Sequence, residues 1–242
     1  MTSTSSKKQG ISSLNALIIF GSATAYFYAL LFTLLPFIKE HFSMNPALYW
    51  FIIGFFLFVP LFCFASVKAV KEGHTSFRQV LDALNIKPLS KRDWKYAVFG
   101  LFLTFLFTGV VFGGSFLLTE LWGVRALTTT PWFMEMHPFQ GVEKLLLLVW
   151  FPMFFFNIVG EEILWRGYIQ SRLRTKHAWP ICSVLWMIFH APFGTDLMLM
   201  LIPIIIIIPY IFHKTQNTTI GIFIHGLYNG PTFVAVALGF LH

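Results

Sequence analysis

The chain has 242 residues, of which 57% are hydrophobic, 19% aromatic and only 11% charged. This composition excludes an ordinary soluble domain and predicts an all-α fold, a polytopic membrane helix bundle with seven to eight transmembrane helices. The net charge of +7 does not predict a nucleic-acid partner, because the basic residues lie between apolar runs, as in loops that anchor helices at a bilayer.

The chain divides into a short polar start and a long apolar remainder. Residues 1–13 predict a disordered cytoplasmic lead to a single transmembrane domain over residues 14–242. Seven apolar runs then predict membrane helices over residues 14–38, 47–67, 96–119, 145–160, 178–193, 197–212 and 220–241. In the third run, Gly109 and Gly113 have the spacing that permits close helix contact. In the sixth run, residues 204–208 are all isoleucine and predict a wall that faces lipid.

Two segments between the runs have their own character. Residues 68–95 contain seven Lys and Arg residues, and Phe77, Val80 and Leu84 fall at helical spacing, which predicts a short amphipathic helix on the membrane surface. Residues 120–142 are mixed in polarity and contain two prolines and several threonines. They fit an exposed loop, a short re-entrant segment or a further helical piece, and the sequence leaves these alternatives open.

The distribution of basic residues predicts the orientation of the chain. With seven spans and a cytoplasmic N-terminus, 14 of the 17 Lys and Arg residues fall on the cytoplasmic side and only Lys39, Arg125 and Lys144 fall outside. This bias follows the positive-inside rule. The short loops favour a prokaryotic cytoplasmic membrane, with the N-terminus inside the cell.

A charged cluster, Glu161-Glu162-Ile163-Leu164-Trp165-Arg166, follows the fourth apolar run. Ionisable residues at membrane depth cost about 2.5–3.5 kcal/mol each, so they are rarely there without a role. On a helix, Glu162 and Arg166 share a face and can form an ion pair, whereas Glu161 points about 100° away and lacks that partner. An unpaired carboxylate beside an anchored one suits a general base, and a salt bridge that closes the end of a span is the alternative.

Two of the eight histidines, His190 and His225, lie within apolar runs. His225 and Asn229 share one face of the last predicted helix. A single intramembrane histidine is more often a structural bridge between helices. However, Glu161, His190 and His225 all lie roughly 12–18 Å from the predicted cytoplasmic boundary at 1.5 Å per helical residue. Because lipid offers polar groups no partners, we expect these three helices to share one wet cavity.

A carboxylate, two imidazoles and an amide in one cavity suit the hydrolysis of an acyl bond. The carboxylate takes a proton from water with help from one histidine, and the other histidine and the amide stabilise the oxyanion. Neither a serine nucleophile elbow nor a phosphate-binding glycine loop surrounds these residues.

Three motifs carry a resemblance to a known family. Glu161-Glu162-x-x-x-Arg166, Trp186-x-x-x-His190 and His225-x-x-x-Asn229 occur in the order typical of the CAAX protease and bacteriocin-processing (CPBP, Abi) family. The chain resembles these intramembrane endopeptidases over about residues 143–242, where the catalytic core is then expected. Trp186 departs from the family, in which phenylalanine is usual at this position.

The resemblance implies roles for six residues. Glu161 and His190 would activate water, His225 and Asn229 would stabilise the oxyanion, and Glu162 and Arg166 would support them. The implied substrate is a peptide or protein tail reached at the membrane. Members of the family have been considered both as metalloproteases and as glutamate proteases, and because this chain lacks a His-Glu-x-x-His motif we expect no metal and no cofactor. A non-catalytic immunity or peptide-binding protein of the same fold and a zinc-dependent protease are alternatives, and a small transporter is a third.

Overall fold

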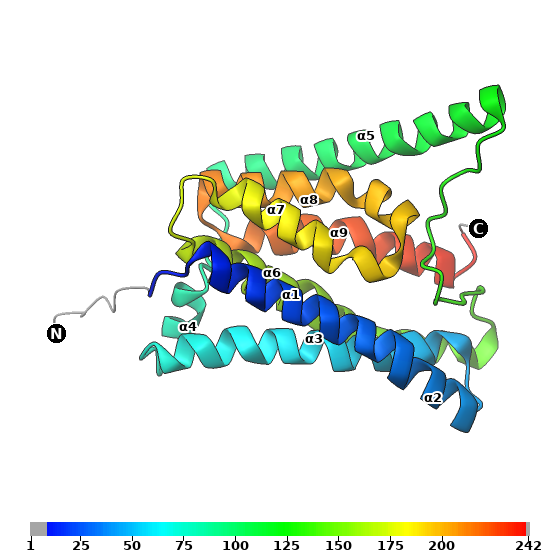
Figure 1. Ribbon diagram of the computed structural model, residues 1–242, viewed down its shortest axis with the longest axis horizontal. Coiled ribbons are helices and arrows are strands. Elements are labelled where there is room, and N and C mark those ends of the chain that lie inside the picture. Colours follow the sequence, from blue (N-terminus) through cyan, green and yellow to red (C-terminus); the bar gives the residue numbers. More distant parts are fainter. Residues whose placement is uncertain (1–8, 241–242) are drawn as a thin grey trace.

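A computed structural model describes residues 9–240 and confirms an all-α membrane bundle (Figure 1). In this range, six helical spans are long and apolar enough to cross a membrane, and the shorter apolar helix Ala178–Phe193 accounts for the seventh predicted run. The α-helices are α1 (Ser13–Ala29), α2 (Leu35–His41), α3 (Pro46–Lys71), α4 (Phe77–Ala83), α5 (Lys91–Trp122), α6 (Leu146–Glu162), α7 (Ala178–Phe189), α8 (Thr195–Thr215) and α9 (Thr218–Ala237).

Shorter helical pieces join or extend these helices. A π-helix, η1 (Leu30–Leu34), makes α1 and α2 one continuous span, and a second π-helix, η3 (Ile163–Ile169), continues α6. The 3-10 pieces are η2 (Gly141–Leu145), η4 (Gln170–Arg172) and η5 (Ala191–Phe193). The charged cluster at residues 161–166 therefore lies at the junction of α6 and the π-helix η3. Such distortions of a helix are frequent at functional sites.

The helices pack against one another mainly in pairs. α3 packs along α6 and η3, α5 packs against α8 and α9, and α7 pairs with α8 and also contacts α1. Figure 1 shows that α1 begins and α9 ends at opposite ends of the bundle, and that α7 and α8 form a hairpin that stops short of the far end of α5. The turn of this hairpin contains His190, so the hairpin places this side chain inside the bundle.

The structure describes only residues 9–13 of the predicted disordered lead, residues 1–13. Its residues 1–8 lie outside the described residues, but Ile11 is buried and forms backbone hydrogen bonds with both sides of Leu173. The Ile11 N–H donates to the Arg172 carbonyl (2.7 Å), and the Arg174 N–H donates to the Ile11 carbonyl (3.0 Å). The last residues of the lead are thus ordered, because they pair with a chain segment far away in sequence.

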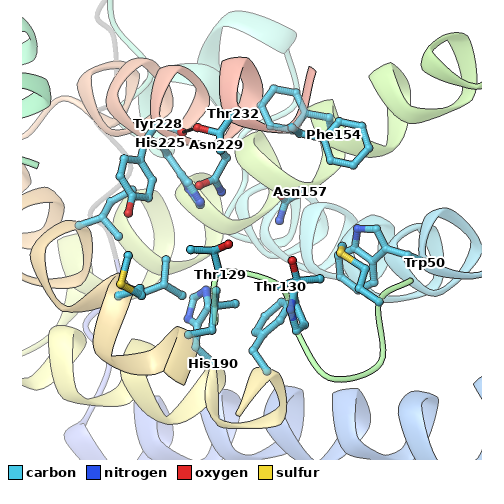
Figure 2. A pocket seen from close by; sticks show the side chains of 18 of the residues that line it. Trp50, Thr129, Thr130, Phe154, Asn157, His190, His225, Tyr228, Asn229 and Thr232 are labelled. Carbon is cyan, nitrogen blue, oxygen red and sulfur yellow. Dashed lines mark hydrogen bonds between the residues drawn. The ribbon is translucent and has the colours of Figure 1, made fainter. Parts of the chain in front are cut away.

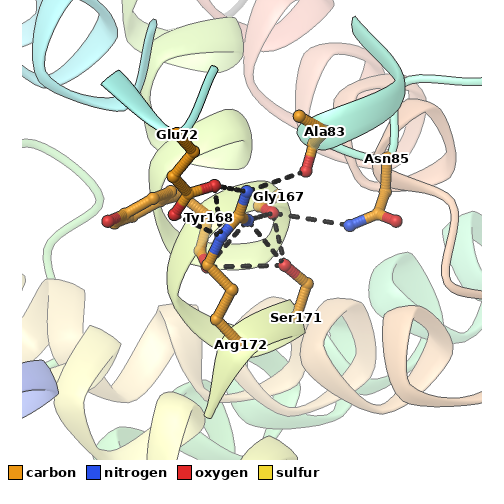
Figure 3. Close-up of polar contacts among 7 residues, drawn as sticks. All are labelled: Glu72, Ala83, Asn85, Gly167, Tyr168, Ser171 and Arg172. Atoms are coloured by element: carbon orange, nitrogen blue, oxygen red, sulfur yellow. Dashed lines mark hydrogen bonds and ion pairs between the residues drawn. The ribbon is translucent and has the colours of Figure 1, made fainter. Parts of the chain in front are cut away.

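A buried arginine organises the end of the bundle at which α4 lies (Figure 3). The Arg172 side chain is fully buried and pairs with Glu72, with Nη2 2.8 Å from Oε2. It also donates to the carbonyls of Ala83 (3.2 Å), Gly167 (3.0 Å) and Tyr168 (3.3 Å). The helix α4 lies within residues 68–95, where the amphipathic pattern predicted a short helix. Arg172 links the last turn of α4 to the π-helix η3.

Two sequence interpretations were wrong about packing. A Cβ atom added to Gly109 or Gly113 would meet nothing within 4 Å, so this glycine pair does not mediate close helix contact in the described structure. Residues 204–208 are not a lipid-facing wall: Ile204, Ile205 and Ile208 are 1–2% exposed, and only Ile206 is exposed, at 46%. Both errors have one cause, since α8 is enclosed by α5, α7 and α9 while the second half of α5 diverges from them (Figure 1).

The open alternatives for residues 120–142 resolve into an ordered connection. Residues 123–140, here called the strap, contain no helix and run from the end of α5 to η2. The Trp132 indole N–H donates to the Pro192 carbonyl (2.9 Å), the Thr128 N–H donates to Asp196 Oδ2 (3.0 Å), and the Phe139 N–H donates to the Ala237 carbonyl (2.7 Å). The strap is therefore tied across the ends of the α7–α8 hairpin and α9.

Candidate active site

The four residues with predicted direct roles line one cavity of about 430 Å³. Glu161 comes from the end of α6, His190 from the turn after α7, and His225 and Asn229 from successive turns of α9. Figure 2 shows the two imidazoles and the Asn229 amide around the same space. Glu161, His190 and His225 are 2%, 6% and 3% exposed, so three distant segments bring ionisable groups together inside the bundle.

The rest of the cavity wall is mainly apolar. α3, α6, α8 and α9 contribute large aromatic and methionine side chains, including Trp50, Met153, Phe154, Met200 and Phe233. The strap contributes Thr129, Thr130, Pro131, Met134 and Met136. The strap therefore covers the cavity where the hairpin ends, and a ligand in the cavity would contact it.

Glu161 is held by two hydrogen-bond donors. The Asn157 side-chain amide donates to Oε1 at 2.9 Å, and the Trp186 indole N–H donates to Oε2 at 2.7 Å. The prediction that Glu161 lacks the Arg166 partner agrees with these contacts, but this carboxylate is not free. Two different helices orient it, and each oxygen still has a lone pair for a further donor.

Glu162 makes the predicted pair and a second one. Its Oε1 lies 2.8 Å from Arg166 Nη2 and 3.0 Å from His225 Nδ1, and all three side chains are almost fully buried. Glu162 approaches α9 closely because residue 221 is glycine, where a Cβ atom would collide with the carboxylate. Arg166 also lies over the Trp186 ring, with its guanidinium carbon 3.5 Å from the ring centroid, in a cation–π contact.

These contacts define which histidine nitrogens are available to a ligand. The His190 Nδ1 lies 2.8 Å from the Trp186 carbonyl, which can only accept, so Nδ1 carries a hydrogen and Nε2 remains available. The His225 Nδ1 faces the Glu162 carboxylate and is likewise a donor, so its Nε2 also remains available. The cavity thus contains an oriented carboxylate, two oriented imidazoles and the Asn229 amide.

Metal binding was a second possible use of these side chains. Across residues 9–240, no three His, Cys, Asp or Glu side chains are grouped so that they could hold a metal ion. The absence of a cofactor stays a prediction.

One residue of the site was missed by the sequence interpretation. Asn157 lies four residues before Glu161, on the same helical face, and it is a polar residue in an otherwise apolar run. That polarity was an available signal. In contrast, the hydrogen bond from Trp186 to Glu161 joins two helices and has no local signal.

Residues 143–230 match the Rce1-like family, described as type II CAAX prenyl endopeptidase Rce1-like, and this segment includes all six predicted site residues. Neither a curated protein nor a solved structure matches the chain. At the family level, the match indicates an intramembrane endopeptidase. The resemblance inferred from the three motifs is therefore confirmed, and residues 143–230 carry the pattern of the Rce1-like type II CAAX prenyl endopeptidases.

Proposed function

We propose that the protein is an intramembrane endopeptidase that hydrolyses a peptide bond in a membrane-associated peptide or protein tail. The observation that carries this proposal is the arrangement of Glu161, His190, His225 and Asn229 around one cavity. Each side chain comes with the chemistry that peptide hydrolysis requires: a base, a group to position water and donors for an oxyanion.

In the proposed reaction, Glu161 accepts a proton from a water molecule while the water oxygen attacks the substrate carbonyl carbon. The His190 Nε2 accepts a hydrogen bond from the same water and orients it. When the tetrahedral intermediate collapses, the carbon–nitrogen bond breaks and the proton on Glu161 passes to the leaving amine. The products are a carboxylic acid and an amine, and no further reactant is consumed.

The oxyanion would form on the side of α9. The Asn229 amide can donate one hydrogen bond to it, and a protonated His225 can donate a second from Nε2. Glu162 favours this arrangement because it accepts from the His225 Nδ1 and keeps the ring in one orientation. Arg166 supports Glu162 through their ion pair.

The cavity lining favours an internal cut in the substrate. None of the described residues that line the cavity is Lys or Arg, so a free C-terminal carboxylate would find no permanently charged cation there. The aromatic and methionine wall suits apolar side chains on either side of the bond. We place the N-terminus in the cytoplasm, as the charge bias favours, and the short loops favour a prokaryotic membrane.

The test uses the full chain in lipid nanodiscs and a set of internally quenched peptides with apolar sequences and an apolar anchor. Cleavage in water enriched in ¹⁸O should place one heavy oxygen in the new carboxylate, which identifies hydrolysis and the bond cut by mass spectrometry. Glu161→Gln keeps the side-chain shape and removes the base, so cleavage should fall about a hundredfold or more. A peptide-binding or immunity protein would bind these peptides without cutting them, and full activity in Glu161→Gln would remove Glu161 from the mechanism.

A further inference from the structure

We infer that Trp186 is the positioning residue of the active site, which orients the Glu161 carboxylate through its indole N–H while Arg166 holds the ring. This inference rests on the proposed hydrolase function. It assigns to Trp186 a hydrogen bond that a phenylalanine at the same position could not make.

Trp186 contacts four of the charged or titratable groups of the proposed machinery, those of Glu161, Arg166, His190 and His225. Its N–H donates to Glu161 Oε2 at 2.7 Å, and its ring lies under the Arg166 guanidinium. The His190 and His225 rings meet it edge to face, at centroid distances of 5.4 Å and 5.6 Å and interplanar angles of 75° and 76°. The side chain is 1% exposed, so these contacts confine it to one orientation.

The direction of the indole N–H is therefore determined by its neighbours. The guanidinium lies on one face of the ring, and the Trp186 carbonyl accepts from the His190 Nδ1, so the same residue also orients the proposed water-positioning imidazole. Together with Asn157, the indole provides one donor for each carboxylate oxygen. Loss of one donor would let the carboxylate rotate away from the water, and small displacements of a catalytic group reduce rates strongly.

The chain supplies a matched control in Trp165. This tryptophan is also fully buried, but its indole N–H has no hydrogen-bond acceptor among the described residues. It stacks on Phe20, with ring centroids 3.9 Å apart, and it does not line the cavity. A Trp→Phe change at residue 165 thus removes the same atoms as at residue 186 without removing a hydrogen bond.

The kinetic test compares Trp186→Phe with Trp165→Phe, each in nanodiscs with the cleaved peptide. A genetically encoded 3-benzothienylalanine at residue 186 is the decisive variant, because sulfur replaces the N–H and the bicyclic shape is kept. For this variant we expect kcat to fall about ten- to a hundredfold with KM within about twofold. Trp165→Phe should keep the wild-type kcat.

A spectroscopic test reads the hydrogen bond without cleavage. The protein has 8 tryptophans, so ¹⁵N-labelled indole groups give a small set of signals, and the one absent from Trp186→Phe is that of Trp186. In Glu161→Gln this signal should move upfield, because a neutral amide accepts a hydrogen bond more weakly than a carboxylate. An unchanged signal would contradict the proposed contact.

The outcomes separate the two proposals. If Glu161→Gln is inactive and the benzothienyl variant cleaves at the wild-type rate, the inference about Trp186 is wrong and the proposed function stands. If Glu161→Gln cleaves normally, Glu161 is not the base and the inference about Trp186 fails with that assignment. If the wild type binds the peptides without cutting them, the proposed function itself fails. A fall in kcat that is equal in Trp165→Phe would also overturn the inference, because it would reveal a packing effect common to both sites.

Discussion

Replacement of Glu162 by glutamine should separate structural support from chemistry at the paired glutamates. Glu162 is fully buried and lies 2.8 Å from Arg166 and 3.0 Å from His225. The change keeps the shape of the side chain and one oxygen acceptor, but it removes the negative charge. The Arg166 cation, 1% exposed, would then remain buried without its ion-pair partner.

The loss of stability expected for Glu162→Gln follows from the burial of Arg166. Breaking a buried ion pair by removing one partner costs about 3–5 kcal/mol, because the remaining charge is uncompensated. The glutamine oxygen can still accept the hydrogen bond that His225 Nδ1 donates to Glu162, so we expect the lower end, about 3 kcal/mol of unfolding free energy. That is roughly a hundredfold change in the ratio of folded to unfolded protein.

The assay is equilibrium unfolding in mixed micelles, paired with the peptide-cleavage assay. Glu162→Gln should lose both stability and activity, whereas Glu161→Gln should stay within about 1 kcal/mol of the wild type and lose only activity, because it breaks no ion pair. Glu120→Gln is the matched control, since the same chemical change falls on an exposed residue. Wild-type stability in Glu162→Gln would refute the reasoning, because it would mean that Arg166 does not need the Glu162 charge.

Three further predictions concern orientation, metal and packing. Reporter fusions after Lys87 and after the C-terminal residue should give opposite signals, and the same signal from both would mean that the number of spans is wrong. Activity should persist in a strong chelator, whereas a loss that zinc restores would make the two cavity histidines metal ligands. Gly221→Ala should lower stability by about 1–3 kcal/mol because its Cβ would meet the Glu162 carboxylate, and Gly109→Ala should not destabilise because its Cβ would meet nothing; thermal unfolding of the pair checks this.

The sequence alone determined the features that depend on neighbours within one helix. Apolar runs located the membrane spans, since a backbone in lipid must satisfy its own hydrogen bonds. The four-residue spacing predicted the ion pair between Glu162 and Arg166, which forms even though a π-helix begins at Ile163. The same spacing placed His225 and Asn229 on one face, and equal depth brought three helices to one layer of the membrane.

Contacts between helices were decided only by the tertiary structure. The donors to Glu161 and the pairing of Glu162 with His225 depend on where α7 and α9 lie relative to α6. The closely packed glycine is Gly221 and not Gly109, although Gly109 has the better-known motif spacing. Similarly, the strap over residues 123–140 is held by partners on α8, η5 and α9 that no local pattern indicates.

The membrane environment explains why the sequence did not show which helix faces pack against other helices. In a soluble protein, an apolar helix face predicts burial, because water excludes it. In a bilayer, lipid accommodates an apolar face as well as another helix does, so periodicity does not show which faces meet protein. Residues 204–208 illustrate this: five isoleucines fit lipid equally well, and only the positions of α5, α7 and α9 bury three of them.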